Sequence, residues 1–329
     1  MSARRKVDHV VILDGTMSSL MPGLATNAGQ TYHLLLERRD PKITVFYEPG
    51  LQWQGLRKAV EVMAGVGLNR QIQRAYRFLC HRYRPGDRIF LMGYSRGAYA
   101  VRSLAGIIDR YGLLRHDVAS GRNVRFIYSY YSEERGSRFG DRFAQRYCHR
   151  SVHIEMIGVW DTVKALGFDT PLIWRLAPMA TEFHSDQLSH TVRHGYHALA
   201  LDERRIAYAP ILWRCPPGFM GHVEQVWFRG THGDIGGQLT GFEAARPLAN
   251  IPLVWMLERI EKCGVALPEG WRARFPCDPE APSVGMNRGW GKLFMLRKKR
   301  VAGQDLSERL HETVPEPARP KRFGLRIGA

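Results

Sequence analysis

The chain has 329 residues, of which 44% are hydrophobic, and this is enough for one large α/β domain or two small ones. The sequence contains no apolar run of about 18 residues, so we expect no transmembrane helix. Its five cysteines are widely spaced and form no C-x-x-C pair, which argues for reduced thiols and against a structural zinc site. A net charge of +17 favours anionic partners, although basic residues spread along a chain are also typical of a solvated surface.

The first apolar run, residues 7–13, predicts a buried strand that ends at a glycine turn, Asp14-Gly15-Thr16. Ligands of open α/β sheets bind at the carboxyl edge of the sheet, where such a turn presents backbone N–H groups. We therefore expect Gly15 or Thr16 to supply one donor of an oxyanion hole. The side chains of Asp14 and Thr16 are equally consistent with a role in shaping the turn.

Strand and helix patterns alternate along much of the chain. Further strands are expected at residues 43–47, 87–92, 152–159 and 224–228, and helices at about 27–38, 69–83, 98–112 and 247–262. Strands that alternate with helices predict a mostly parallel central sheet with helices on both faces, which is an α/β fold.

Residues 91–100 have the pattern of a strand, a sharp turn and a helix, with Ser95 at the turn. Gly93 and Gly97 flank the serine, and in a nucleophile elbow these positions are small because helix and strand pass close together. The pentapeptide alone is a weak signal, and a tight turn with an uninvolved serine is the alternative. The surrounding strand and helix favour Ser95 as a nucleophile, with the N–H of Arg96 as the first donor of the oxyanion hole.

Two further residues follow predicted strands. Asp161 comes just past the strand at 152–159, where the acid of a triad belongs, although an N-cap is the alternative. His232 lies in a glycine-rich loop after the strand at 224–228, which favours a general base over a histidine that only packs the loop. Asp234 is a candidate to orient a neighbouring group or to cap the next turn.

The chain order Ser95, Asp161, His232 is that of α/β-hydrolases. Segments that carry these residues and their neighbours are 13–16, 83–99, 158–163, 198–204 and 230–237. Together they resemble the bacterial α/β-hydrolase domain of unknown function 2235, which includes phospholipase effectors of type VI secretion, over roughly residues 7–265. The resemblance implies an α/β-hydrolase fold and a triad with Ser95 as nucleophile, Asp161 as acid and His232 as histidine. The family usually has a third glycine in the loop after the histidine, where this chain has Gln238.

We expect an α/β-hydrolase domain over residues 1–290, with cap or insert regions at 113–150 and 164–222, and a basic, flexible tail at 291–329. For 113–150, a cap over the site and a surface subdomain that packs its own aromatic residues are both open. The many histidines of 164–222 are expected in a lid or on the surface. Asp202 or Arg204, in a charged run, is a candidate to anchor a loop through an ion pair.

The favoured function is a serine esterase or lipase-like enzyme that hydrolyses a carboxylic ester, with a lipid or phospholipid among the candidate substrates. Ser95 would attack the ester carbonyl, His232 would shuttle the proton and Asp161 would orient the imidazole. We expect no cofactor and no metal ion. Expected partners are the ester substrate and an anionic membrane surface, with no specific nucleic acid. The expected location is cytoplasmic, with export by a secretion system that needs no cleavable signal.

Two other functions compete with this interpretation. The chain could be a non-catalytic module on the same fold that binds an anionic partner through its basic surface, because fold does not fix function. A weaker hypothesis assigns Asp14, Asp161, His232 and Asp234 to a metal site for phosphoester hydrolysis.

Overall fold

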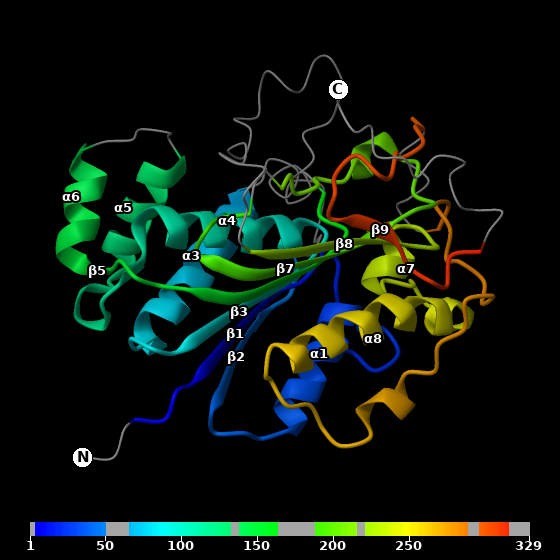
Figure 1. The fold of residues 1–329 in the computed structure, drawn as a ribbon, viewed down its shortest axis with the longest axis horizontal. Coiled ribbons are helices and arrows are strands. Elements are labelled where there is room, and N and C mark those ends of the chain that lie inside the picture. The colour runs from blue at the N-terminus through cyan, green and yellow to red at the C-terminus, as the bar shows by residue number, and fades with distance from the viewer. Residues whose placement is uncertain are drawn as a thin grey trace.

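The computed structural model of the chain describes residues 4–50, 66–132, 138–163, 188–215, 221–288 and 296–315. Its centre is a seven-stranded sheet with the order β2-β1-β3-β6-β7-β8-β9, in which every neighbouring pair is parallel (Figure 1). The strands are β1 (Asp8–Leu13), β2 (Ile43–Glu48), β3 (Arg88–Tyr94), β6 (Ile154–Trp160), β7 (Val192–Ala200), β8 (His222–Phe228) and β9 (Glu308–Leu310). The expected mostly parallel sheet is confirmed.

Helices cover both faces of the sheet. On one face lie α1 (Asn27–Glu37) and α8 (Arg246–Lys262), and on the other lie α3 (Val66–Arg82) and α4 (Arg96–Tyr111) (Figure 1). Each pair of helices encloses its own apolar core against the sheet. The arrangement is therefore the α/β-hydrolase fold that the sequence predicted.

Local sequence explains where these elements begin and end. The hydroxyl of Thr26 caps α1 by accepting the N–H of Gly29 at 3.0 Å. Helix α4 ends at Gly112, whose φ of +77° is a conformation that favours glycine. Strand β1 is buried along its whole length because helices cover both of its faces, which is why its sequence is an unbroken apolar run from Val10 to Leu13.

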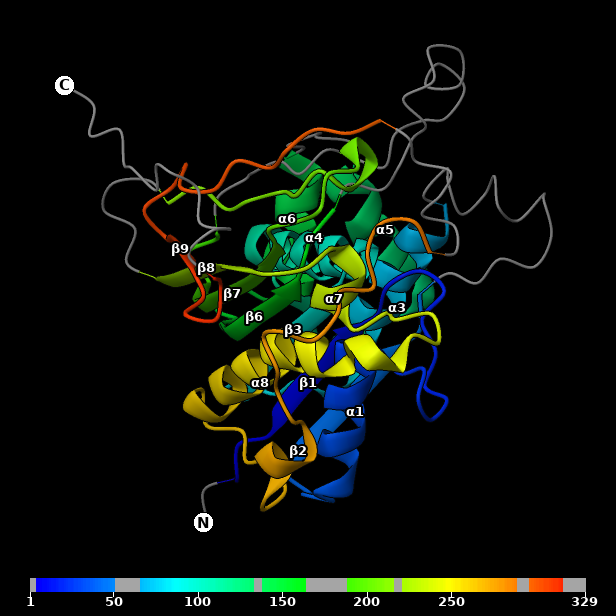
Figure 2. The ribbon, with the colours of Figure 1, turned by 90° about the vertical axis from the view of Figure 1, so that its right-hand side faces the viewer.

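Parallel strands bring their carboxyl ends to one edge of the sheet. The chain leaves β1 for α1 on one face and leaves β3 for α4 on the other, so the edge has a switch point between these two strands. Figure 2 looks onto this edge and shows the short helix α7 (His232–Gly236) in front of the sheet. The loops that carry the candidate site residues all leave the sheet here.

The segment 113–150 forms a separate layer on the helices. It contains a two-stranded pair, β4 (Leu113–Leu114) and β5 (Cys148–His149), the 3₁₀ turn η1 (His116–Val118), and helices α5 (Gly121–Ser132) and α6 (Arg138–Tyr147). These elements pack on α3 and α4, with Arg110 of α4 ion-paired to Asp141 at 2.9 Å. They lie at the end of the sheet away from α7 (Figure 1). Within the described part of this segment the ring of Phe126 contacts those of Tyr130 and Phe143, as expected of a subdomain that packs its own aromatic residues.

The described part of 164–222 departs from the expected insert. Its residues 192–200 form β7, a central strand between β6 and β8. His197 on this strand is completely buried, not part of a lid. Its Nε2 accepts the N–H of Thr162 at 3.1 Å, and burial lowers its pKa to about 3, so the imidazole is neutral. Residues 164–187 and 216–220 lie outside the described residues.

The expectation of a flexible tail is wrong for residues 296–315. This segment supplies β9, which pairs with β8 at the edge of the sheet. The carboxylate of Glu308 holds it there by accepting the indole N–H of Trp227 at 2.7 Å and three backbone N–H groups of residues 303–305. Residues 289–295 and 316–329 lie outside the described residues.

The remaining described elements are three 3₁₀ turns, η2 (Ile206–Tyr208), η3 (Glu243–Ala245) and η4 (Trp271–Arg274). Within the ranges that the structure describes, no helix combines the length and the hydropathy needed to cross a bilayer.

Candidate active site

Ser95 occupies the sharp turn between β3 and α4. Its backbone has a φ of +58° and a ψ of −120°, a strained conformation for a residue with a side chain. A Cβ on Gly97 would lie 2.0 Å from the carbonyl oxygen of Leu13, and one on Gly93 would lie 2.6 Å from that of Gly97. Both glycines are therefore required by the close passage of α4 over β1 and β3.

Three side chains that lie far apart in the sequence meet at this turn. The Nε2 of His232 lies 2.8 Å from the Oγ of Ser95, and its Nδ1 lies 2.6 Å from Oδ2 of Asp161. Ser95 and His232 are 7% and 5% exposed, and Asp161 is fully buried. The distances are within hydrogen-bond reach, so a proton can pass between hydroxyl and imidazole while the carboxylate fixes the ring.

Asp161 is held by more donors than His232 alone. Its Oδ1 accepts the N–H of Ala200 at 3.1 Å and the Nη1 of Arg300 at 2.6 Å, and its Oδ2 accepts the Nη2 of Arg300 at 3.0 Å. Burial alone would raise the pKa of Asp161, but the Arg300 guanidinium and the hydrogen bond from His232 hold that pKa well below its usual range. The carboxylate is therefore ionised although Asp161 has no solvent-exposed surface.

Two tyrosine rings lie close to the imidazole of His232. The centroid of the Tyr94 ring lies 4.9 Å from that of the imidazole, and the centroid of the Tyr208 ring, from η2, lies 4.7 Å from it. The guanidinium of Arg205 lies over the Tyr208 ring at 4.2 Å. The imidazole therefore packs against aromatic rings while its two nitrogens contact Ser95 and Asp161.

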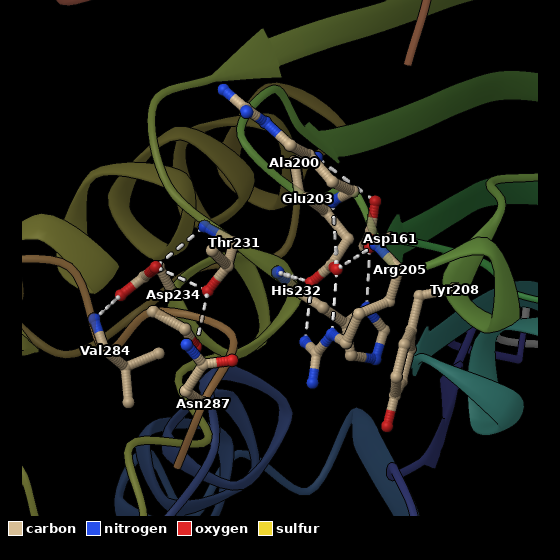
Figure 3. Close-up of polar contacts among 12 residues, drawn as sticks. Asp161, Ala200, Glu203, Arg205, Tyr208, Thr231, His232, Asp234, Val284 and Asn287 are labelled. Atoms are coloured by element: carbon tan, nitrogen blue, oxygen red, sulfur yellow. Dashed lines mark hydrogen bonds and ion pairs between the residues drawn. The ribbon is translucent and has the colours of Figure 1, made fainter. Parts of the chain in front are cut away.

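A buried ion pair supports the start of α7 (Figure 3). Glu203, which is fully buried, accepts the N–H of His232 at 3.1 Å and the Nε and Nη2 of Arg205 at 2.8 and 2.6 Å. Burial opposes ionisation of Glu203, but the hydrogen bond and charge of Arg205 lower its pKa overall. Asp202 contacts the loop before α7, as expected, but through a hydrogen bond: its carboxylate accepts the N–H of Gly230 at 2.7 Å.

Asp234 caps α7 and does not face the triad (Figure 3). Its Oδ2 accepts the N–H of Thr231 at 2.7 Å, and its Oδ1 accepts the N–H of Val284 at 2.8 Å. Of its two expected roles, the structure favours the cap.

Asp14 shapes the loop after β1. Its Oδ1 accepts the N–H of Gly15 at 2.6 Å, and its Oδ2 accepts the hydroxyls of Thr26 at 2.6 Å and Tyr47 at 2.7 Å. Burial raises the pKa of Asp14 to about 6. Because the oxygens of Asp14 and Asp234 are engaged in these separate loops, the structure does not bring together the four residues of the metal hypothesis. No group of three ligating side chains suited to a metal ion occurs among the described residues.

The candidate oxyanion donors separate into two cases. The N–H of Gly15 is turned into its own loop toward Asp14, so Gly15 does not serve as a donor. The loop nevertheless touches the elbow, because a Cβ on Gly15 would lie 3.4 Å from that of Ser95. Thr16 is therefore the candidate from this loop, and its carbonyl accepts the side-chain N–H of Gln238 at 2.9 Å. Arg96, the first residue of α4, follows Ser95 directly, and burial lowers the pKa of its side chain to about 10.

Four residues of the site were not predicted from sequence: Glu203, Arg205, Tyr208 and Arg300. The charged run at 202–205 was visible as a pattern, but only its partners in the fold reveal which charges are buried.

The parallel sheet and the serine at its strand–helix turn define the class of protein, an α/β-hydrolase. The model of a family described as "T6SS, Phospholipase effector Tle1-like, catalytic domain" matches residues 8–259. The chain belongs to this family of phospholipase effector catalytic domains.

The individual proteins similar to this chain are longer than it, and they share 30% sequence identity or less with it. An uncharacterized protein of Saccharomyces cerevisiae is 30% identical over 223 residues, which is 60% of this chain and 31% of the yeast protein. The crystal structure of an uncharacterized protein from Pseudomonas aeruginosa has a TM-score of 0.44 at 16% identity, and covers 83% of this chain and 49% of its own. The structure of the Tle1 effector bound to the VgrG spike of the type VI secretion system has a TM-score of 0.39 at 16% identity, with 71% and 52% covered. This chain thus spans about a third of the yeast relative and about half of each solved chain.

Proposed function

We propose that the chain is a serine hydrolase that cleaves a carboxylic ester of a lipid, with a phospholipid as the first candidate, through an acyl-enzyme. The observation that carries the proposal is the continuous hydrogen-bond chain from Ser95 through His232 to Asp161, with contacts of 2.8 and 2.6 Å. The family of phospholipase effector catalytic domains supports the lipid substrate.

Acylation begins at Ser95. Because the ionised Asp161 accepts the proton on Nδ1 of His232, Nε2 carries a lone pair and can take the hydroxyl proton. The serine oxygen bonds to the ester carbonyl carbon, and the carbonyl oxygen becomes an oxyanion. The N–H groups of Arg96 and Thr16 are the proposed donors to this oxyanion. The imidazolium then gives its proton to the leaving alcohol oxygen as the ester bond breaks.

Deacylation repeats these steps with water. His232 accepts a proton from a water molecule, whose oxygen bonds to the acyl carbon of the Ser95 ester. The second oxyanion collapses, the carboxylic acid leaves, and the proton on Nε2 returns to the serine oxygen. The tyrosine rings pack beside the imidazole that both half-reactions use.

The net charge of +17 supports an anionic membrane surface as the place where the substrate is met. Cytoplasmic synthesis followed by type VI export is the proposed route, supported by the family alone.

A panel of phospholipids and short-chain esters tests the proposal. Wild type should release fatty acid, Ser95→Ala should not, and Ser103→Ala should match wild type. Ser103 is the matched control because it is also buried on α4, at 7% exposure. A wild type that binds anionic vesicles but turns over no ester would support the non-catalytic binding module instead.

A further inference from the structure

The C-terminal strap, residues 296–315, crosses the carboxyl edge of the sheet. Its first part pairs with the segment after β7, because the N–H of Lys298 donates to the carbonyl of Arg204 at 2.7 Å and the carbonyl of Leu296 accepts the N–H of Ile206 at 3.1 Å. Its last part joins the sheet as β9. In Figure 2 the strap runs in orange and red across the top of this edge. The strap therefore passes close to the end of β6, where Asp161 lies.

One side chain of the strap enters the site. The guanidinium of Arg300 binds both oxygens of Asp161, at 2.6 and 3.0 Å, and the side chain is only 4% exposed. The same two nitrogens donate to the carbonyl of Ala200, at 2.9 Å, and to that of Tyr208. Arg300 thus connects the ends of β6 and β7 with η2, the turn whose tyrosine covers the imidazole of His232.

The contact restricts the orientation of the carboxylate. A guanidinium fork fits the two oxygens of a carboxylate in one plane, so Asp161 cannot turn about its last bond without losing a charge-assisted hydrogen bond. With Arg300 on both oxygens, Oδ2 stays directed at Nδ1 of His232. An acid without this support would have the N–H of Ala200 as its other hydrogen-bond donor among the described residues.

We propose that Arg300 is a positioning residue for the acid of the triad, so that the strap beyond the family-matched region completes the active site. The inference rests on the proposed function, because it assigns Arg300 a role through Asp161 and His232. The matched region ends at residue 259, and Arg300 lies outside it.

The charge of Arg300 gives the proposal a signature that packing alone would not produce. Asp161 and Ser95 contact the two ring nitrogens of His232, and the rings of Tyr94 and Tyr208 lie beside its imidazole. Glu203 accepts its backbone N–H. Two cations complete the surroundings: Arg205, which is paired with Glu203, and Arg300, which is paired with Asp161. Arg300 is the cation that shares the carboxylate with the imidazole. Removing it takes away the second cation at the carboxylate of Asp161, so a positive charge on the imidazole of His232 is stabilised more strongly.

The experiment compares Arg300→Met and Arg300→Lys with Arg309→Met in the full chain. Arg309 is the matched control because it lies on the same strap and is ion-paired to Glu224, away from Asp161. We expect Arg300→Met to lower kcat by about 10- to 100-fold with a smaller change in KM, as for a displaced catalytic group. Arg300→Lys keeps the positive charge but cannot bind both carboxylate oxygens as a guanidinium does, so its kcat should lie between those of wild type and Arg300→Met. The acidic limb of the kcat/KM profile should move to higher pH in Arg300→Met and stay in place in Arg309→Met.

A second readout needs no turnover and separates this inference from the proposed function. The proton that His232 shares with Asp161 should give a far-downfield NMR signal, to be assigned by its absence in His232→Gln. Its titration midpoint should rise in Arg300→Met relative to wild type and Arg309→Met. An unchanged midpoint, or activity of Arg300→Met within about twofold of Arg309→Met, overturns the inference even if wild type is an esterase. If Arg300→Met does not fold, the lysine variant carries the test, and a wild-type kcat and midpoint in that variant overturn the inference.

Discussion

The side-chain amide of Gln238 donates a hydrogen bond of 2.9 Å to the carbonyl oxygen of Thr16, which joins the loop after the histidine to the loop after the first strand. The family resemblance leads us to expect a glycine at position 238, and a glycine cannot make this contact. The contact holds the peptide on the carboxyl side of Thr16, the residue whose N–H is the proposed second oxyanion donor. Gln238 therefore links the loop after His232 to the loop after β1, although the family resemblance identified this position only as one where the chain lacks the usual glycine.

Replacing this glutamine tests the oxyanion assignment. Gln238→Leu should lower kcat by about tenfold, less than the loss of a whole donor, because the N–H of Thr16 remains but is no longer fixed. KM should change little, because the lost interaction stabilises the transition state and not the bound substrate. Steady-state kinetics on the best ester from the panel provide the measurement. The exposed Gln304→Leu serves as control, and equal kcat in the two variants would argue against Thr16 as a donor.

Asp161→Asn should affect both activity and stability. The amide has one acceptor oxygen, so it cannot accept both the Nδ1 proton of His232 and the N–H groups of Arg300 in the same geometry. The wrong imidazole tautomer is then favoured, and kcat should fall by about 10⁴-fold. The buried Arg300 also loses its counter-ion, which should lower the free energy of unfolding by roughly 3 kcal/mol. Urea unfolding and ester kinetics on the same preparation check both effects. Retained activity would remove the acid from the mechanism.

The buried carboxyl of Asp14 predicts a pH dependence of stability. Its pKa of about 6 in the folded state lies above the ordinary value of 3.8, so the folded state binds the proton more tightly than the unfolded state. The linked stability is present below about pH 4 and is lost as pH rises to about 6, an effect of roughly 3 kcal/mol. Denaturant unfolding of wild type and Asp14→Asn from pH 4 to 7 measures it. As pH rises, the free energy of unfolding of wild type should fall by this amount relative to that of Asp14→Asn. A difference in unfolding free energy that stays constant with pH would contradict the assignment.

Gly97→Ala tests the geometry of the elbow. The added Cβ would lie 2.0 Å from the carbonyl of Leu13, so α4 and β1 must separate. We expect a loss of several kcal/mol or failure to fold, as for overpacking against rigid backbone. The matched control is Gly121→Ala on α5, where the nearest atom to the added Cβ is 3.8 Å away. Thermal melts of the two variants should differ clearly, and equal melting temperatures would show that the elbow has room.

The parts of the fold that sequence predicted have strong local signals. The elements β1, β3 and α4 are continuous apolar or helical patterns bounded by turn residues, and their observed limits lie close to the expected ones. Because parallel strands share one carboxyl edge, placing Ser95, Asp161 and His232 just after strands was enough to predict that they meet.

The parts that were missed depend on tertiary contacts. Strand β7 contains His197, whose polar ring is tolerated in the core only because Thr162 and Gln225 bind it. Strand β9 has three residues, too few for a periodic pattern. Arg300 sits in a basic run that is typical of a solvated surface, and its partner lies 139 positions away. No local pattern distinguishes it from Lys298.

The site of covalent labelling by a fluorophosphonate, read by peptide mass spectrometry, tests whether Ser95 is the nucleophile. We expect a phosphonyl adduct on Ser95 in wild type and little or none in His232→Ala, because the imidazole must take the hydroxyl proton for the oxygen to attack. An adduct on another residue, or equal labelling of Ser95 with and without His232, would contradict this expectation.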